Sequence, residues 1–476
     1  MAVAIPALAV VGVLLLRRSP NAREAVSLVA GLATAATVAG LWPVVGQGLR
    51  FELWSWLPGL SFAFELEPLG LLFATVAAVL WPVTTLFAIG YMRGNDEPRQ
   101  AGFYAWFAVS IAAALWIAFS ANLVTLFVGY EVLTLVTVPL VTHEGGAAAR
   151  RGGRIYLGLL LTTSIGLLLP AIGWTWSLAG STDFVPGGLL SGQAGAGVLT
   201  VLLVLFVFGI GKAGLMPFHR WLPSAMVAPT PVSALLHAVA VVKAGVFAVL
   251  KVSIYIFGLD TLAVTGASTP MMWVAAVTLV LASVVALTRD NLKARLAYST
   301  ISQLAYIVLA AMLANRAAAA GGALHLATHA VGKITLFFCA GAIYTAVHRN
   351  RVSELDGLGR AMPWTFGAFG VASLSIVGLP PMGGTWSKWL LLEGTAEAGQ
   401  PVLTAILLLG SLLSFAYLIP IPVRAFLRPA PAGDLGLREA PPACVVPLVL
   451  TAAACAALFF VPDAVIGPLA GALELP

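Results

Sequence analysis

The chain has 476 residues, of which 60% are hydrophobic and only 9% are charged, and its formal net charge is +6. Soluble globular domains carry roughly 25% charged residues, so this composition excludes a protein whose whole surface faces water. In a chain this apolar, the excess of basic residues indicates loops on the cytoplasmic side of a membrane rather than a nucleic-acid partner.

Apolar runs long enough to cross a membrane, about 20 residues each, follow one another along the whole chain. No connector between them is long enough for a separate soluble domain. The first run lacks the basic start and the small-residue cleavage site of a signal peptide, so we interpret it as the first span. The predicted spans are 2–16, 25–48, 68–92, 103–120, 122–141, 154–178, 197–216, 231–256, 269–288, 297–315, 320–346, 363–392, 401–423 and 442–462.

The basic residues test this assignment independently. If the N-terminus lies outside, the outer loops hold only Arg50 and Arg316, and the inner loops hold most of the other basic residues. The positive-inside rule expects such a bias for correctly counted spans. We therefore predict fourteen spans, with both termini on the outer side of the membrane. The inner basic residues are Arg17, Arg18, Arg23, Arg93, Arg99, Arg150, Arg151, Arg154, Arg220, Arg289, Lys293, Arg295, Arg349, Arg351, Arg360, Arg424, Arg428 and Arg438.

Two predicted spans contain helix-breaking residues. The seventh contains GIGKAGLMP (209–217), and the twelfth contains GLPPMGGTWSK (378–388). Broken helices paired between two halves of a chain are typical of transporters built from inverted repeats. The breaks lie five spans apart, which fits two five-helix repeats. The predicted fold is thus an all-α polytopic membrane protein with four segments: 1–102 (spans one to three), 103–256 (spans 4–8, first repeat), 257–423 (spans 9–13, second repeat) and 424–476 (linker and span fourteen).

Five of the six lysines lie inside predicted spans, whereas the arginines lie in loops, at span ends or in the short 216–231 connection. Arginine stays protonated in proteins, but a buried lysine can give up its proton. A lysine at the bilayer centre costs about 2.5–3.5 kcal/mol on insertion scales. This segregation predicts proton transfer within the membrane. The five lysines are Lys212, Lys243, Lys251, Lys333 and Lys388.

Glu131 is the acidic residue that lies deep in a predicted span. We expect it to face the protein interior and to pair with a lysine, because unpaired charge in hydrocarbon is costly. Such a pair could act as a switch, since opening it changes how readily each partner holds a proton. The alternative is a static salt bridge that only fixes helix packing.

Histidines extend this set of titratable groups. His325, His329 and Lys333 follow the spacing i, i+4, i+8, which places them on one face of a helix. Histidine titrates near neutral pH and can pass a proton between its two ring nitrogens. His237 and Lys243 lie six residues apart, on roughly opposite sides of their helix unless it is broken between them. A single histidine in a span would more often be a packing residue.

We expect no cofactor and no metal in this chain. The three cysteines lie in apolar runs with no CxxC or Cys/His pattern, and no GxGxxG loop follows a strand. The prediction is a transporter subunit rather than an enzyme. If the chain belongs to a redox complex, electron transfer belongs to its partners.

Four motifs carry a resemblance to a known family. They are GKAGLMPFHRWLPSAMVAPTPVSALLHAVAVVKAG (211–245), LKARLAYSTISQ (292–303), HAVGKITLFF (329–338), and GLPP (378–381) followed by Ser387-Lys388. They resemble the antiporter-like, proton-translocating membrane subunits of respiratory complex I, membrane-bound hydrogenases and Mrp-type Na+/H+ antiporters. The resemblance spans roughly residues 60–460.

The resemblance implies fourteen helices, two inverted five-helix repeats and a row of charged residues across the membrane midplane. By motif, Glu131 matches the glutamate of the fifth helix and Lys212 its lysine partner on the broken seventh. Lys251 matches no relay position, and a structural role is favoured for it. The remaining candidates are Lys243, the central lysine of helix eight, His237 on the same helix, His329 and Lys333 at the relay of helix eleven, His325 on that helix with a less clear match, and Lys388 on helix twelve.

The chain ends just past helix fourteen, which is similar to the shorter members of the family, such as the D-type subunits of Mrp antiporters. The favoured function is a proton-conducting subunit of a multisubunit Na+ (or K+)/H+ antiporter, with other membrane subunits as partners. One alternative is a proton-pumping subunit of a complex I-like oxidoreductase or a membrane-bound hydrogenase. A third possibility is a coupling subunit that conducts nothing and holds its lysines in static pairs.

Overall fold

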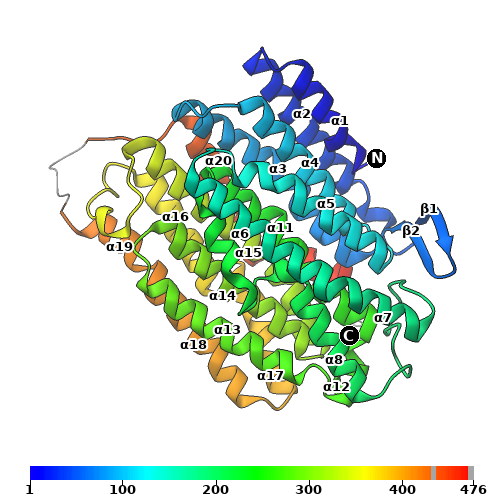
Figure 1. Cartoon of the computed structure of the whole chain (residues 1–476). Helices are drawn as coiled ribbons and strands as arrows, with labels where there is room; N and C mark the ends of the chain where they lie inside the picture. The colour runs from blue at the N-terminus through cyan, green and yellow to red at the C-terminus, as the bar shows by residue number, and fades with distance from the viewer. Residues whose placement is uncertain (430–435, 470–476) are drawn as a thin grey trace.

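The structure is a computed structural model that describes residues 1–429 and 436–469, and it is a bundle of packed helices (Figure 1). Within those residues, ten helical segments are long and apolar enough to cross a membrane, and three shorter apolar helices accompany them. The predicted helical, multi-pass fold is confirmed. The count of fourteen spans and the four-segment division stay predictions, and residues 470–476 of the C-terminus, predicted on the outer side, lie outside the described part.

The first half of the described chain contains the following helices. They are α1 (Ala4–Leu15), α2 (Pro20–Ala39), α3 (Pro68–Gly94), α4 (Gln100–Ala118), α5 (Leu123–Val141), α6 (Ala147–Thr163), α7 (Leu169–Ala179), α8 (Ala196–Gly209), α9 (Trp221–Ser224), α10 (Thr230–Ala234) and α11 (Val241–Val252). The second half continues with α12 (Leu259–Thr265), α13 (Thr269–Thr288), α14 (Leu292–Met312), α15 (Arg316–Val347), α16 (Pro363–Val377), α17 (Gly384–Glu397), α18 (Pro401–Leu418), α19 (Pro420–Leu427), α20 (Pro442–Phe460) and α21 (Asp463–Ile466).

Several helices begin at polar residues that satisfy the free amides of the first turn. The side chains of Asn122, Asn291 and Asn315 accept hydrogen bonds from backbone amides at the starts of α5, α14 and α15. Glu67 does the same for α3. Such caps contribute about 1 kcal/mol each. Local sequence therefore sets where these spans begin.

A β-hairpin between α2 and α3 was not predicted. Strand β1 (Arg50–Leu57) pairs antiparallel with β2 (Leu60–Glu65) through a turn at Pro58-Gly59, where Gly59 has a φ of 75°. Tryptophan and phenylalanine favour strands, and Pro-Gly favours a turn, so the signal was present in the sequence. The hairpin projects from the bundle beside α5 and α7 (Figure 1).

One helical stretch forms the axis of the bundle, because every residue from Thr230 to Phe257 is buried. It comprises α10, α11 and two π-helical turns, at Leu235–Val239 and Ser253–Phe257. It contacts α3, α14 and α15. A π-turn within a helix frequently marks a functional site. This axis carries His237, Lys243 and Lys251.

The helix is interrupted at both predicted places. After α8 ends at Gly209, the chain forms only one-turn helices until α10, and prolines at 217, 223 and 229 cannot donate to a helical ladder. After α16 ends at Val377, six residues pass before α17 begins at Gly384. Lys212 lies within the first interruption and Lys388 in the second turn of α17.

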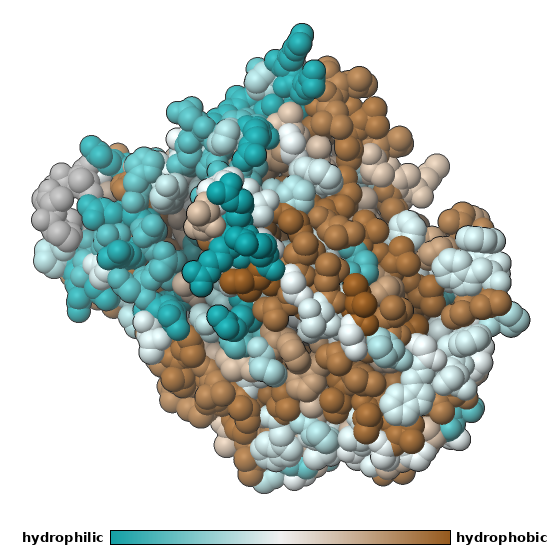
Figure 2. All heavy atoms as spheres, viewed as in Figure 1, coloured by the Kyte–Doolittle hydropathy of each residue, from teal (hydrophilic) through white to brown (hydrophobic). Residues whose placement is uncertain are grey.

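The loops gather at two ends of the bundle. Figure 2 shows an apolar band between a strongly hydrophilic end on the left, near α19 in Figure 1, and a paler polar rim at the lower right. We call the strongly hydrophilic end the basic end. Ion pairs tie its loops to the helices, including Arg424 to Asp356 at 2.7 Å. The hydrogen bonds and charge of Arg424 hold the pKa of the Asp356 carboxyl below its usual value.

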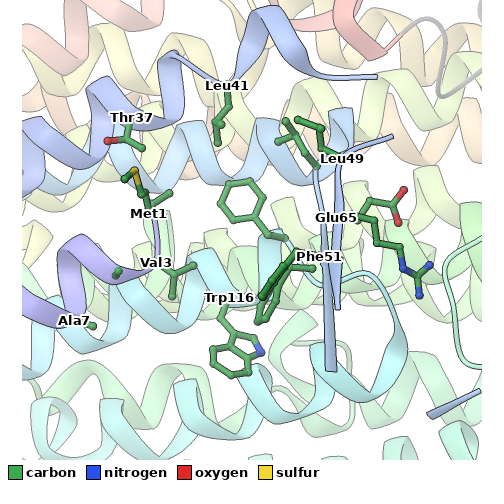
Figure 3. Close-up of a pocket in the computed structure, with 15 residues that line it drawn as sticks. Met1, Val3, Ala7, Thr37, Leu41, Leu49, Phe51, Glu65 and Trp116 are labelled. Carbon is green, nitrogen blue, oxygen red and sulfur yellow. The ribbon is translucent and has the colours of Figure 1, made fainter. Parts of the chain in front are cut away.

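A large apolar groove of about 750 Å³ lies between α1, α2, α4 and the hairpin (Figure 3). Figure 3 shows Met1, Leu41 and Trp116 on its sides and Glu65 at its edge. Hydrocarbon side chains line most of it, and none of the candidate lysines or histidines takes part. The groove therefore lies apart from the titratable groups.

Candidate functional site

Lys212 is fully buried in the first interruption and binds α5. Its Nζ donates to the Tyr130 carbonyl oxygen at 2.7 Å and to the hydroxyl of Thr134, and it lies 3.2 Å from the centre of the Tyr130 ring. Tyr130 and Thr134 are one turn apart and so share a face of α5. A Cβ on Gly245 of α11 would come within 2.4 Å of the Lys212 backbone, so only glycine allows this approach.

Glu131 is next to Tyr130 in the chain but forms no hydrogen bond or ion pair with Lys212. Within the described residues Glu131 forms no ion pair, and its Oε1 is buried without a hydrogen-bond partner. Consecutive residues on a helix point about 100° apart, and Tyr130 is the one that faces Lys212. The expected direct Glu131–Lys212 contact is thus absent from the structure.

Lys243 and His329 form a contact between the two halves of the chain. Lys243 Nζ on α11 lies 2.6 Å from His329 Nδ1 on α15, and both side chains are buried. His325 lies one turn earlier on α15, with its ring stacked on that of His329 at 5.7 Å between centres. One titratable amine and two imidazoles therefore lie next to one another in space.

The series continues from His325 to α17 and α18. His325 Nδ1 lies 2.9 Å from Ser387 Oγ, and the Tyr306 ring stacks on His325 at 5.7 Å between centres. The Tyr306 hydroxyl lies 3.5 Å from Ser411 Oγ, to which Lys388 Nζ donates at 3.0 Å. Hydroxyl groups thus bridge the space between the imidazoles and the last lysine.

Lys388 also binds the helix end that the second interruption exposes. Its Nζ donates to the carbonyl oxygen of Val377, the last residue of α16, at 3.0 Å. Carbonyls at a helix C-terminus lack intrahelical donors and attract cations. Gly378 has a φ of 89°, and a Cβ there would come within 2.7 Å of the Lys388 side chain. The glycine both ends α16 and makes room for the lysine.

A second set of hydrogen-bonded groups runs from Lys333 toward α18. Its Nζ donates to the Ser299 hydroxyl, and Ser299 donates to the Tyr417 hydroxyl at 3.0 Å. The Tyr417 hydroxyl lies 3.0 Å from Ser414, which accepts a hydrogen bond from Gln303. These groups are buried, so the branch is a polar network inside the bundle.

His237 lies in the π-turn before α11. Its ring packs against Phe337 at 4.7 Å between centres, and neither ring nitrogen has a hydrogen-bond partner among the described residues. The helix is irregular between His237 and Lys243, because a π-turn ends at Val239 and Ala240 has φ −107° and ψ −71°. The sequence analysis allowed for a break in the helix between His237 and Lys243, and the structure contains such a break.

Lys251 makes the only ion pair of a span lysine among the described residues. Its Nζ lies 3.1 Å from Glu67 Oε1 and donates to the Ser120 carbonyl oxygen at 2.8 Å. Glu67 also caps α3 and accepts from the Tyr255 hydroxyl at 3.0 Å. The ion pair and the hydrogen bonds here join helix ends, which supports the structural role favoured for Lys251.

Sequence reasoning missed the neutral members of the site. Tyr130, Ser299, Tyr306, Ser387 and Ser411 hold the lysines or bridge them to histidines. Hydroxyl residues are common in membrane helices, so their presence alone gives no signal. Ser387 is the exception, because it stands beside Lys388 in one of the family motifs of the sequence, although no role was assigned to it.

The arrangement is suited to proton transfer. In the described structure the hydrogen bonds of Lys212, Lys243, Lys333 and Lys388 go to hydroxyls, carbonyls or an imidazole, and not to carboxylates. A buried ammonium without a carboxylate partner is poorly compensated. Lysine can relieve that cost by releasing its proton, and a neighbouring imidazole can take it.

The sequence matches one family profile over most of this site. The profile described as "NADH:quinone oxidoreductase/Mrp antiporter, TM" matches residues 120–414. That range contains Glu131, the histidines of α15 and the four lysines with neutral partners. The resemblance drawn from the motifs is therefore confirmed.

Individual proteins are similar over most of the chain. A NADH-quinone oxidoreductase subunit N from Desulforudis audaxviator is 31% identical over 88% of this chain and 86% of its own length. A probable K(+)/H(+) antiporter A/B-type subunit from Rhizobium meliloti is 30% identical over 93% of this chain but only 44% of its own length. A chain of the Mrp complex from Dietzia sp. DQ12-45-1b has the same fold, with a TM-score of 0.85 at 20% identity over 99% of this chain and 96% of its own.

Proposed function

Because this chain belongs to the NADH:quinone oxidoreductase/Mrp antiporter family of transmembrane subunits, we propose that it conducts protons along its buried lysines and histidines. The observation that carries this proposal is the row of neighbouring buried groups from Lys243 through His329 and His325 to Lys388. The series crosses from α11 in the first predicted repeat to α17 in the second.

The proposed route starts at one direct contact, between Lys243 and His329, and continues through neighbouring groups. Lys243 gives its proton to His329 Nδ1, and His329 releases one from Nε2 to the neighbouring His325, whose Nε2 is likewise without a partner in the described structure. From His325 the proton moves toward Lys388 through the space between the Ser387 hydroxyl, which lies within hydrogen-bond distance of His325, and the Ser411 hydroxyl, to which Lys388 donates. Imidazole suits this step because its two nitrogens exchange donor and acceptor roles.

Lys212 and Glu131 set how readily the series loads. A positive Lys212 raises the cost of placing another positive charge nearby in a medium of low dielectric constant. The Glu131 carboxylate offsets part of that cost. A change in the protonation of either residue therefore changes which group of the series can hold the next proton. In this proposal, that effect at a distance takes the place of the direct ion-pair switch expected from the sequence.

We further propose that the complex is a multisubunit monovalent cation/H+ antiporter in a bacterial inner membrane, with other membrane subunits as partners. The similarity to a probable K(+)/H(+) antiporter and to a chain of an Mrp complex supports this choice. By the positive-inside rule, the basic end faces the cytoplasm and both termini face the periplasm. The second candidate is a redox-driven proton pump, which the similarity to a NADH-quinone oxidoreductase favours.

Purification with native partners tests the choice between these functions. We expect small membrane subunits to co-purify, and vesicles that contain the complex to show proton movement when Na+ or K+ is added without an electron donor. Proton movement that requires NADH or another reductant would support the redox pump instead. If neither cation nor reductant moves protons in vesicles that contain the assembled complex, proton conduction is refuted.

A further inference from the structure

The apolar groove between α1, α2, α4 and the hairpin has the size and lining of a site for a hydrocarbon chain. Its volume of about 750 Å³ lies within the range of about 300–1,000 Å³ that is usual for ligand sites. Figure 3 shows Val3, Leu41, Phe51 and Trp116 around it. The indole nitrogen of Trp116 already donates to the Thr125 carbonyl oxygen at 2.9 Å. An apolar recess of this kind loses packing contacts when nothing fills it.

The groove opens at the depth where lipid headgroups are expected. Figure 1 shows the hairpin on the side of the bundle away from α19 and the basic end. The hairpin exposes Trp54 and Trp56, which are 61% and 40% accessible. Tryptophan is enriched at membrane–water interfaces because its ring is apolar and its N–H is polar. From the hairpin the groove extends along α1 as far as Ala7, so it leads from the headgroup level toward the hydrocarbon layer.

Two opposite charges stand at the edge of the groove. Arg50 and Glu65 both line it and pair directly across the hairpin, which places their side chains on the same face. Arg50 donates to Asp183 at 2.9 Å, and a guanidinium has further N–H donors. The half-buried Glu65 carboxylate has no hydrogen bond or ion pair among the described residues. Burial raises the pKa of this carboxyl despite the opposing charges of Lys251 and Arg50, so a further positive charge nearby would stabilise its ionised form.

A zwitterionic headgroup with a primary amine matches these two charges. Its phosphate can accept charge-assisted hydrogen bonds from the free donors of Arg50, and its ammonium can donate to Glu65. A headgroup that carries only negative charge would be repelled by Glu65 and Asp183. A quaternary ammonium has no N–H to donate to the carboxylate. The acyl chains of the same lipid supply the hydrocarbon that the apolar walls require.

We propose that the groove binds one phospholipid of the phosphatidylethanolamine class, with an acyl chain between α1, α2 and the hairpin, its phosphate at Arg50 and its ammonium at Glu65. The lipid fills the space between α1 and the hairpin and so holds the hairpin against the bundle. The site is independent of the proposed proton transfer, because none of the candidate lysines or histidines lines it.

Photocrosslinking in the assembled complex identifies what occupies the groove. Phe51→p-benzoylphenylalanine places the reactive group on the groove wall, and Trp54→p-benzoylphenylalanine places it on the same strand outside the groove lining. The complex is purified in mild detergent, irradiated and analysed by mass spectrometry. We expect phosphatidylethanolamine adducts at position 51 and at least about tenfold fewer at position 54, where lipid is not held and is washed away. A crosslink from position 51 to another protein subunit, or no lipid adduct there, would overturn the proposal.

Lipid competition tests the recognition of the headgroup. Delipidated complex is supplied with equal amounts of phosphatidylethanolamine, phosphatidylglycerol and phosphatidylcholine, and the adducts at position 51 are compared. We expect phosphatidylethanolamine to dominate, and Glu65→Gln or Arg50→Gln to reduce its adduct about tenfold, because each removes one charge-assisted contact. Glu52→Gln is the control, since Glu52 lies on the same hairpin but does not line the groove.

Size-exclusion chromatography shows which variants assemble. If a charge variant fails to assemble, the competition on the complex with both charges intact still decides the question. Equal adducts from the three lipids in that complex would contradict recognition of an amine headgroup. An unchanged phosphatidylethanolamine adduct in assembled Glu65→Gln and Arg50→Gln complexes would also contradict it.

Discussion

A complex that carries Lys212→Met is expected to assemble normally and to lose cation-dependent proton movement. Methionine fills the space of the lysine stem but cannot carry the charge that Tyr130 and Thr134 hold in place. Loss of a positioned titratable group typically lowers a proton-transfer rate by about 10²–10⁴-fold. The measurement is the initial rate of dye-reported pH change in everted vesicles after a Na+ or K+ pulse.

The matched control removes a buried lysine that lies off the relay. Lys251→Met combined with Glu67→Gln deletes both members of the structural ion pair, so neither charge is left buried alone. This variant should keep most of the transport rate. Glu131→Gln should reduce transport less than Lys212→Met, because Glu131 acts without direct contact. Normal transport by Lys212→Met would mean that this lysine only fixes helix packing.

The second large effect is expected at His329. Replacing it with glutamine keeps a polar group beside Lys243 but removes the imidazole that accepts a proton on one nitrogen and releases it from the other. Because this contact joins the two halves of the series, we expect a loss of rate close to that of Lys212→Met. Stopped-flow measurement of the same dye signal checks this.

His143 provides the control for His329. It is buried at the end of α5, away from the relay, where its ring packs on Phe103. His143→Gln should leave the transport rate nearly unchanged. If His329→Gln retains the wild-type rate while the complex is intact, the proton does not pass through this histidine, and the series from Lys243 to Lys388 is not the path.

The helical fold could be predicted because the membrane imposes it. Span-length apolar runs, asparagine caps and glycine–proline breaks are local signals, and both interruptions lie where the sequence places them. The hairpin between α2 and α3 was missed because its aromatic strands resemble a connector between spans. Pro58-Gly59 and the flanking tryptophans were nevertheless a usable signal for a turn between two strands.

Only the charged residues of the site could be predicted from the sequence. A lysine in a span stands out because its burial is costly, whereas a serine or tyrosine does not. The absence of a contact between Lys212 and Glu131 could not be predicted, since it depends on how α5 is rotated toward the interruption. Tyr130 rather than Glu131 faces the lysine, and one residue along a helix changes the direction by about 100°. The roles of all these residues stay predictions until transport is measured.

The most direct test of the central claim is transport by Lys243→Arg, with Lys251→Arg as its control. Arginine keeps the positive charge but does not release a proton in proteins. If the buried amines exchange protons during turnover, the assembled Lys243→Arg complex will show no cation-dependent pH change, while Lys251→Arg will retain it. A wild-type rate in Lys243→Arg would show that a fixed charge suffices there, and that protons do not travel through this amine.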